Sequence, residues 1–257
     1  MSISCLRFFT VYGPRQRPEI DWPTREWPEA RPDSEVDRGR IEKTLDRLFA
    51  TPAPAASGET KSLVVAHRGR IVVERYGAEY GPETPFVSWS CAKSILHAGV
   101  GILVRQAKLD IFARADDPAW RAPGDARAAI TLDCLLRMSS GLEFNEDYVD
   151  TEGSDAIRML FGAGKPDTAA YAAAKPLAHE PDTFFSYSSG TSNIVSAAVA
   201  RALGADEAAY RSFLHAQLFD RIGMRNTLLS VDRFGDFIMS SQVYTNARDL
   251  ARMGLLY

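Results

Sequence analysis

Apolar residues recur along the chain with two different periods, which separate an early strand-rich part from a later helical part. Residues 62–67 (SLVVAH) and 70–75 (RIVVER) are short runs rich in valine and isoleucine, which is typical of β-strands. The Arg68-Gly69 pair between them predicts a tight hairpin. Because a lone two-stranded hairpin is only marginally stable in water, further strands or a packed helix must cover it.

Helical spacing appears before this hairpin. In residues 37–48, Ile41, Leu45 and Leu48 fall on one side of a helix, which predicts a surface helix. A Pro/Ala/Ser/Gly-rich stretch at residues 51–60 then predicts a loop.

The later part of the chain is predicted to be mainly helical. Thr131 and Thr191 are expected N-caps, because a threonine side chain can accept a hydrogen bond from the first turn. Strands followed by a run of helices indicate an α+β fold, with a helical lobe packed against an antiparallel sheet. The expected helices cover residues 90–108, 131–138, 154–161, 191–203, 207–219 and 247–256.

The first 35 residues differ from the remainder. They are rich in proline and arginine and show no sustained period, so we expect residues 1–35 to form an extended arm and residues 36–257 to form the body.

Composition narrows the function classes. The chain has 257 residues, 46% of them hydrophobic and 25% charged, which is ordinary for a globular protein. The net charge of -3 comes from 30 basic and 33 acidic residues that are interspersed. No basic surface for nucleic acid or an anionic membrane is therefore expected, and the predicted partner is a small molecule.

The apolar runs and the cysteines predict a location. No apolar run reaches the roughly 18 to 20 residues that span a bilayer, and the start lacks a signal-peptide pattern. Cys5, Cys91 and Cys134 form an odd, sparse set, which favours a reducing compartment and a cytoplasmic protein. The four histidines show no metal-ligand spacing, so no zinc site is expected.

Ser90 and Lys93 are the first candidates for chemistry. They stand three residues apart in the first turn of the predicted helix FVSWSCAKSILHAGVGILVRQ, and this spacing puts both side chains on one face. A lysine can take the proton of a serine when burial and the positive end of a helix lower its pKa. Since Ser-x-x-Lys also occurs by chance, the motif needs a second signal.

Tyr187 supplies that second signal. It begins a YSSG segment that follows two phenylalanines and directly precedes an expected helix, so a short loop could present it to a cleft. A tyrosinate near a lysine cation can act as general base toward a serine and later as acid toward the leaving group. The structural alternative is a buried tyrosine whose hydroxyl is satisfied by the backbone.

The order of these motifs resembles the serine β-lactamase and penicillin-binding-protein superfamily. The similarity runs from about Trp22 to Tyr257 and is closest to the class C-like branch, near the 6-aminohexanoate-dimer (nylon oligomer) hydrolases. The matching stretches are VVAHRGRIVVERY, SWSCAKS, ITLDCLLRMSSGL, FSYSSGTSN, LFDRIGMRNT and SSQVYTNARDLARMGLLY.

The resemblance implies a β-lactamase/transpeptidase-like fold and a serine hydrolase that works without metal or cofactor. Ser90 would form an acyl-enzyme with a short amide, including a cyclic amide, or with an ester. Lys93 would tune Ser90 and Tyr187 would shuttle the proton. The backbone N–H of Ser90 would form half of the oxyanion hole.

Three further residues are predicted to contact substrate. Ser189 lies in the tyrosine loop, and Trp89 precedes the nucleophile, where core packing is the alternative reading. Glu146 belongs to an acidic cluster that could border the cleft and select cationic amides, or could simply be solvated. The other members of the cluster are Glu143, Asp147 and Asp150.

The sequence also departs from the family pattern. The Lys-Thr-Gly-like or His-x-Gly-like triad near the C-terminus has no counterpart, so we expect a truncated member that lacks the C-terminal strands. Its hairpin would expose an edge that favours aggregation or self-association. Residues 138–141 read MSSG where many relatives have His-Thr-Ser-Gly, and residues 181–182 read Pro-Asp where Pro-Gly is usual.

A third departure lies at the N-terminus. Residues 5–19 (CLRFFTVYGPRQRPE) resemble a segment of sugar-nucleotide epimerases, and Tyr171 and Lys175 fit the Tyr-x-x-x-Lys pattern of those enzymes. We reject that function because no Gly-rich dinucleotide turn follows an early strand. A gene-fusion or assembly junction, reaching to about residue 20, is our hypothesis for this piece.

Three functions stay open at this stage. The first is an amidase or esterase, the second is a β-lactamase or D,D-peptidase, and the third is an inactive fragment or binding module. Specificity lies in loops and C-terminal strands, so sequence motifs do not separate the first two. The third has support because losing one oxyanion donor typically lowers the rate about 10²- to 10³-fold.

Overall fold

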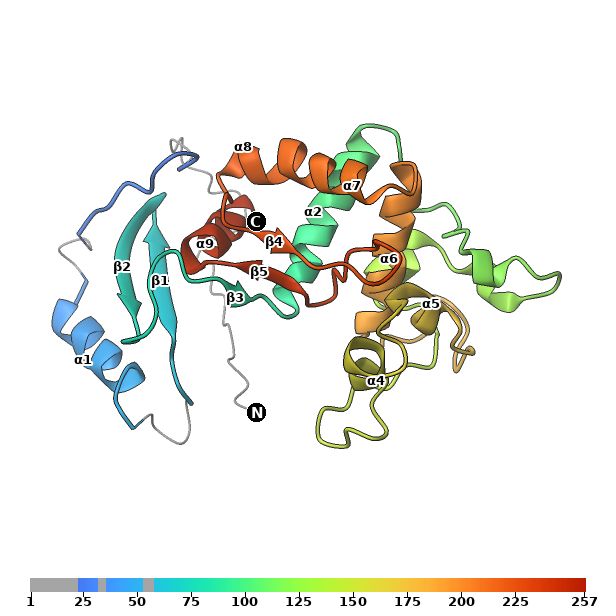
Figure 1. Ribbon diagram of the computed structural model, residues 1–257, viewed down its shortest axis with the longest axis horizontal. Coiled ribbons are helices and arrows are strands. Elements are labelled where there is room, and N and C mark those ends of the chain that lie inside the picture. The colour runs from blue at the N-terminus through green and yellow to red at the C-terminus, as the bar shows by residue number, and fades with distance from the viewer. Residues whose placement is uncertain (1–22, 32–35, 53–57) are drawn as a thin grey trace. The chain divides into compact units, whose positions relative to one another are not determined.

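The computed structural model divides the chain into two compact units, which we describe separately (Figure 1). The described residues are 23–31, 36–52 and 58–257. The first unit comprises Met1–Phe86, Phe219–Leu228 and Tyr244–Tyr257. The second comprises Val87–Leu218 and Leu229–Val243. The arm expected over residues 1–35 lies mostly outside the described residues and stays a prediction.

The first unit is built on the predicted hairpin, which the structure confirms. Strand β1 (Ser62–His67) pairs antiparallel with β2 (Arg70–Tyr76). Arg68 and Gly69 both have positive φ, +50° and +73°, as expected for a two-residue turn that follows the twist of its strands. The turn residues thus set the register beside the turn, and the register shifts between Val65 and Ala66.

Helices cover this hairpin in the way its marginal stability requires. Helix α1 (Arg38–Leu48) buries Leu45, and the Asp37 carboxylate caps it. Helix α9 (Ala247–Leu256) contacts β1, and its Arg248 forms an ion pair with Glu74 of β2 at 2.6 Å. The remaining described helix of this unit is α8 (Asp220–Ile222).

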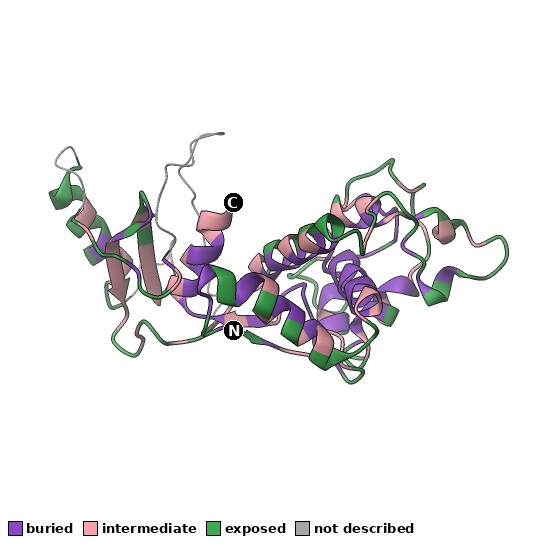
Figure 2. Ribbon diagram, turned by 90° about the horizontal axis from the view of Figure 1, so that it is seen from above, coloured by how far each residue is buried: buried purple, intermediate pink, exposed green. Residues whose placement is uncertain are grey.

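Helix α6 (Ser189–Ala202) is the centre of the second unit. Residues 189–200 are all buried, and buried residues gather on the helices of this unit (Figure 2). Small side chains permit close packing, since a Cβ on Gly190 would lie 2.6 Å from the Phe144 ring. The helices that α6 packs against are α2 (Cys91–Arg105), α3 (Leu132–Leu136), α4 (Asp155–Phe161), α5 (Thr168–Ala173) and α7 (Glu207–Leu214).

The helix caps agree with the sequence prediction at one position and differ at another. Thr131 caps α3 by accepting a hydrogen bond from Cys134 N at 3.1 Å, as predicted. The prediction of Thr191 as a cap is wrong, because Ser188 caps α6 and accepts from Thr191 N at 3.2 Å. Serine is also the better cap by type, and the helix begins directly after Ser188.

Short elements outside the predicted set complete the structure. Strands β3 (Phe86–Val87), β5 (Val243–Thr245) and β4 (Leu228–Leu229) form a three-stranded sheet in the order β3-β5-β4. Short 3₁₀ segments lie at Pro118–Trp120 and Ala126–Ala129. The second part of the helix expected over residues 207–219 is a π-helix, His215–Phe219. Antiparallel pairing and consecutive helices confirm the α+β prediction.

None of the helices within the described stretches has the length and apolar character that crossing a bilayer demands.

Candidate active site

The turn before Ser90 has an unusual backbone. Ser90 is exposed and opens helix α2. Ser88 N donates to Val243 O at 2.7 Å, and Ala92 N donates to Trp89 O at 3.0 Å. Trp89 has a left-handed φ of +46°, which costs roughly 1–2 kcal/mol for a residue with a Cβ. Strain of this kind is concentrated at functional sites.

Lys93 is buried beside Ser90 and uses all three of its ammonium donors. The residue is 7% exposed, and Nζ donates to Ser90 Oγ at 3.2 Å, Ser189 Oγ at 3.2 Å and the carbonyl oxygen of Ser240 at 2.8 Å. Burial lowers the pKa of Lys93 to about 8, and the negative charge of Glu146 opposes this shift. A fraction of Lys93 is therefore neutral near pH 7, which an ordinary lysine is not.

Tyr187 completes the predicted trio. Lys93 Nζ lies 5.0 Å from the centre of the Tyr187 ring. Burial raises the pKa of the Tyr187 hydroxyl, and its hydrogen bond with Ser90 opposes the shift. The residue is nevertheless 42% exposed, and its hydroxyl is in the phenol form near pH 7 because the pKa is raised.

Ser189 lies between Lys93 and a carboxylate. Its hydroxyl donates to Glu146 Oε1 at 2.7 Å, and its backbone N–H donates to Glu146 Oε2. The Tyr148 hydroxyl also donates to Glu146 Oε1, at 2.6 Å. Glu146, a predicted substrate contact, therefore uses both carboxylate oxygens within this chain.

Two residues that sequence reasoning missed complete the surroundings of Lys93. The Asn193 side-chain oxygen accepts a hydrogen bond from Ser240 N at 3.1 Å, and both residues are buried. This bond orients the Ser240 carbonyl that Lys93 contacts. Both residues fall in the family-like stretches FSYSSGTSN and SSQVYTNARDLARMGLLY. The feature that could have identified them is a polar side chain at a position that the fold buries. Tyr148 is also absent from the predicted set.

The loop that carries Glu146 is tied to Asp155. Asn145 N donates to Asp155 Oδ2 at 2.9 Å, and Asp155 N donates to Asn145 O at 2.7 Å. Tyr171 donates to Asp155 Oδ1 at 2.7 Å, and Lys175 forms an ion pair with the same oxygen. The Tyr-x-x-x-Lys pair thus has a structural partner. The epimerase-like residues 5–19 lie outside the described residues.

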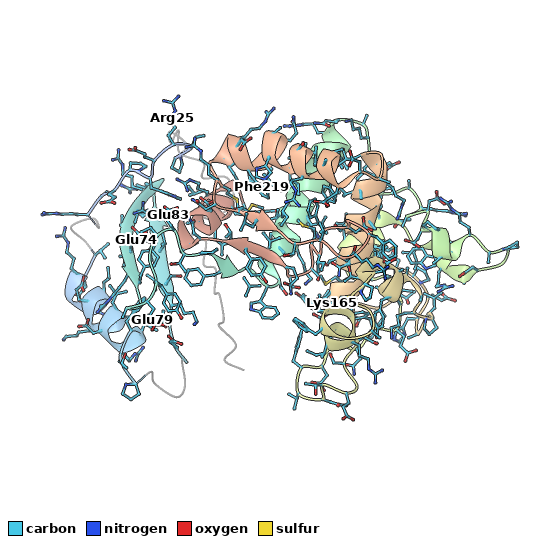
Figure 3. All side chains as sticks on the ribbon, in the orientation of Figure 1. Arg25, Glu74, Glu79, Glu83, Lys165 and Phe219 are labelled. Atoms are coloured by element: carbon cyan, nitrogen blue, oxygen red, sulfur yellow. The ribbon has the colours of Figure 1, made fainter. Side chains whose placement is uncertain are left out.

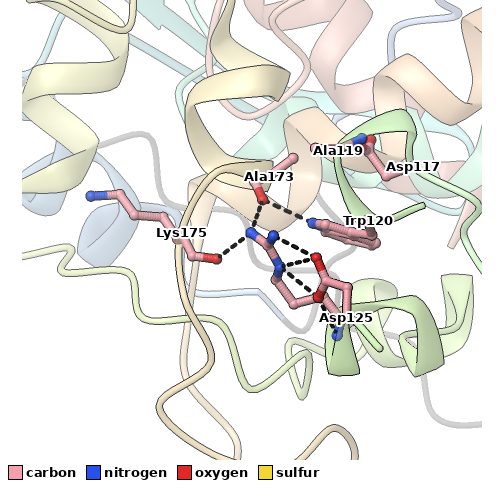
Figure 4. Close-up of polar contacts among 7 residues, drawn as sticks. Asp117, Ala119, Trp120, Asp125, Ala173 and Lys175 are labelled. Carbon is pink, nitrogen blue, oxygen red and sulfur yellow. Dashed lines mark hydrogen bonds and ion pairs between the residues drawn. The ribbon is translucent and has the colours of Figure 1, made fainter. Parts of the chain in front are cut away.

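Arg127 fixes the segment that carries Lys175 (Figure 4). Its Nη1 donates to the carbonyl oxygens of Ala173 and Lys175 at 3.0 and 3.1 Å. Its Nη2 pairs with Asp125 at 2.6 Å. Trp120 Nε1 also donates to Ala173 O, at 2.8 Å. These bonds hold the end of α5, and through Lys175 they support the loop described above.

Two positions in the segments that depart from the family pattern have a left-handed backbone. Asp182, at the usual glycine position, has φ of +69°, a conformation that aspartate tolerates better than most residues. Its carboxylate also accepts from Arg137 at 2.7 Å. Gly141 has φ of +77°, and a Cβ there would lie 2.2 Å from the carbonyl oxygen of His179. The turn therefore requires glycine at 141 but accommodates aspartate at 182.

Trp89 enters this site through its backbone. The structure brings together Ser90, Lys93, Tyr187, Ser189 and Glu146, whereas the Trp89 side chain is half-buried.

A family model described as Beta-lactamase matches residues 46–256. The chain belongs to the β-lactamase family. The family resemblance seen in the sequence is thus confirmed.

A curated protein similar to this chain is the 6-aminohexanoate-dimer hydrolase of Paenarthrobacter ureafaciens. It is 24% identical over 204 residues, which cover 76% of this chain and 51% of the relative. The chain therefore spans about half the length of that relative.

Solved structures share the fold of this chain. A Bacillus anthracis protein with the provisional description 6-aminohexanoate-dimer hydrolase matches with a TM-score of 0.64 and 20% identity, covering 88% of this chain and 61% of that one. A class C β-lactamase mutant matches with a TM-score of 0.60 and 16% identity, covering 86% and 65%. At these identities the likeness shows the fold alone, and it confirms the predicted β-lactamase/transpeptidase-like architecture.

Proposed function

We propose that this chain is a serine hydrolase that cleaves a short amide or ester through an acyl-enzyme on Ser90. The observation that carries the proposal is Lys93, which is buried, has a pKa lowered to about 8, and lies 3.2 Å from Ser90 Oγ. A lysine in this state can accept the serine proton. The name of the curated relative, an amide hydrolase, supports the same reaction class.

The residues present support a balanced proton path. Neutral Lys93 takes the Ser90 proton while Ser90 Oγ bonds to the substrate carbonyl carbon. When the tetrahedral intermediate collapses, the leaving nitrogen or oxygen takes a proton from Tyr187, and the Lys93 ammonium restores the Tyr187 phenol. Water then cleaves the ester, and its proton returns by the same groups to Ser90. The backbone N–H of Ser90 is the proposed donor to the developing oxyanion.

The acidic loop supports a preference for amides that carry a positive charge. Asp147 and Asp150 are exposed, and their loop carries Glu146, whose carboxylate lies against Ser189. Exposed carboxylates attract cations, although solvent and salt weaken the effect. Comparing a linear amide that bears a free amine with its N-acetylated form tests this preference, because equal kcat/KM values would exclude it.

Intact-protein mass spectrometry after treatment with a fluorophosphonate tests the reaction class. The parent should gain one adduct, and the Ser90→Ala variant should gain none. Ser94→Ala is the matched control, because Ser94 is exposed one turn further along the same helix. A folded parent without an adduct would show that the chain is inactive and leave only its family membership.

A β-lactamase or D,D-peptidase is the second candidate, and the fold shared with a class C β-lactamase favours it. All of these reactions use the same serine ester. Turnover of nitrocefin, compared with p-nitrophenyl esters and linear amides, separates them: rapid turnover of nitrocefin alone would replace the amidase proposal.

A further inference from the structure

The hydrogen bonds around Ser189 have a fixed direction. An ionised carboxylate only accepts hydrogen bonds, so the single hydroxyl proton of Ser189 points to Glu146 Oε1 at 2.7 Å. The lone pairs of Ser189 Oγ are then directed to the Lys93 ammonium at 3.2 Å. Glu146 therefore decides which way the Ser189 hydroxyl faces.

This direction matters because Lys93 has no solvent to replace a lost acceptor. Ser189 is 2% exposed and Lys93 is 7% exposed. If the Ser189 proton turned toward Lys93, an O–H would face an N–H and one ammonium donor would be unsatisfied. An unsatisfied buried charged donor is strongly unfavourable, so Lys93 would move away from its position beside Ser90.

The Glu146 carboxylate is itself held from several sides. Ser189 N and the Tyr148 hydroxyl donate to it. The preceding residue, Asn145, donates its N–H to the Asp155 carboxylate and accepts from the Asp155 N–H. A solvated acid at a substrate rim would have no need of these contacts. The geometry indicates a fixed internal group.

We propose that Glu146 is a positioning residue of the nucleophile site, which acts through Ser189 on Lys93 rather than by binding substrate. The inference rests on the proposed function, in which Lys93 activates Ser90. It differs from the sequence-based expectation that Glu146 contacts substrate.

The charge of Glu146 acts on several titratable groups. It opposes the lowering of the Lys93 pKa by burial and adds to the raising of the Tyr187 and Tyr148 pKa values. Cys91 also faces Lys93 and Tyr187, and it shifts their pKa values in the same directions as Glu146 does. Removing the carboxylate charge should therefore lower the pKa of Lys93 and of Tyr187, whichever of the two accepts the proton.

The test is the pH dependence of Ser90 labelling by a fluorophosphonate, which carries no cationic group for Glu146 to bind. In Glu146→Gln the midpoint of the acidic limb should fall by roughly one pH unit, because the amine loses its nearby anion. The plateau rate should fall several-fold, because an amide can turn the Ser189 hydroxyl. Glu152→Gln is the matched control in the same loop, is exposed, and should match the parent.

A second variant isolates the path through Ser189. Ser189→Ala should also lower the plateau rate, and adding Glu146→Gln to it should lower the plateau no further. Thermal unfolding of each variant checks the fold. If Glu146→Gln fails to fold, Ser189→Ala, which keeps the carboxylate, is the remaining test. A parental plateau rate in Ser189→Ala then overturns the inference.

The outcomes separate this inference from the proposed function. A parent that is not labelled at any pH overturns both. A labelled parent whose Glu146→Gln variant keeps the parental midpoint and plateau overturns the inference alone, as expected for a substrate-binding glutamate. An equal loss of plateau rate from Glu146→Gln with and without Ser189 would also overturn it.

Discussion

The reactivity of Ser90 should rise with pH through the pKa of Lys93. Only the neutral amine can accept the serine proton. With a pKa of about 8 instead of 10.5, roughly 9% of Lys93 is neutral at pH 7, against about 0.03% for an ordinary lysine. Burial thus supplies about 300-fold more base at neutral pH.

The assay is the second-order rate of fluorophosphonate labelling between pH 6 and 10, followed by intact mass. The rate should rise about tenfold per pH unit below 8 and level off above it. Lys93→Arg should lose about 10²- to 10⁴-fold, because a guanidinium stays charged and cannot act as base. Lys165→Arg is the control, since Lys165 is exposed (Figure 3).

Two results would refute this reasoning. A rate that is flat with pH, or an inflection near pH 10, would mean that Lys93 is not the titrating base. Labelling of Lys93→Arg at the parental rate would mean that the ammonium acts only as a fixed charge. The second result would instead favour Tyr187 as the base, and Tyr187→Phe would then abolish labelling.

The remaining predictions concern stability, measured by urea unfolding. Because the pKa of Lys93 is lower in the folded chain, its ammonium opposes folding below pH 8 and ceases to do so as the pH approaches 10.5. The stability of Lys93→Met relative to the parent should therefore fall by up to about 3 kcal/mol between pH 7 and 10.5, and a constant difference would contradict the lowered pKa. Gly141→Ala should lose at least about 2 kcal/mol, because positive φ is combined with a contact at 2.2 Å to the His179 carbonyl oxygen. Gly124→Ala, where φ is +83° but nothing lies within 4 Å, should lose only about 1 kcal/mol, and equal losses would exclude the contact as a cause. Asp155→Ala should lose about 1–3 kcal/mol, because Asn145 N and the Tyr171 hydroxyl lose their buried acceptor, and a loss below about 0.5 kcal/mol would show that the tie is dispensable.

Local signals in the sequence predicted the elements that depend on nearest neighbours. The Arg68-Gly69 turn, the cap at Thr131 and the Ser90–Lys93 pair each follow from residues within a few positions of one another. The structure confirms these elements because local hydrogen bonds and backbone preferences determine them.

Elements that depend on distant partners could not be predicted in this way. Strands β3 and β5 have two and three residues, too few for an alternating pattern, and they pair across most of the chain. Helix α5 has six residues, mostly alanine, so it shows no apolar stripe. The hydrogen bond between Ser240 and Asn193 joins residues 47 positions apart, and nothing near either residue predicts the other.

The same limit applies to the chemistry of Lys93. Spacing in the sequence places its amine next to Ser90, but a lysine on an exposed helix face would keep its usual pKa and would not act as base. The lowered pKa requires burial, and the Ser189 and Ser240 oxygens that surround the amine come from segments about 100 and 150 residues later in the chain. All of these residues belong to the second unit, so the contacts that lower the pKa of Lys93 lie within one compact unit. A Ser-x-x-Lys motif is therefore evidence for catalysis only where the fold removes the lysine from water and supplies its acceptors.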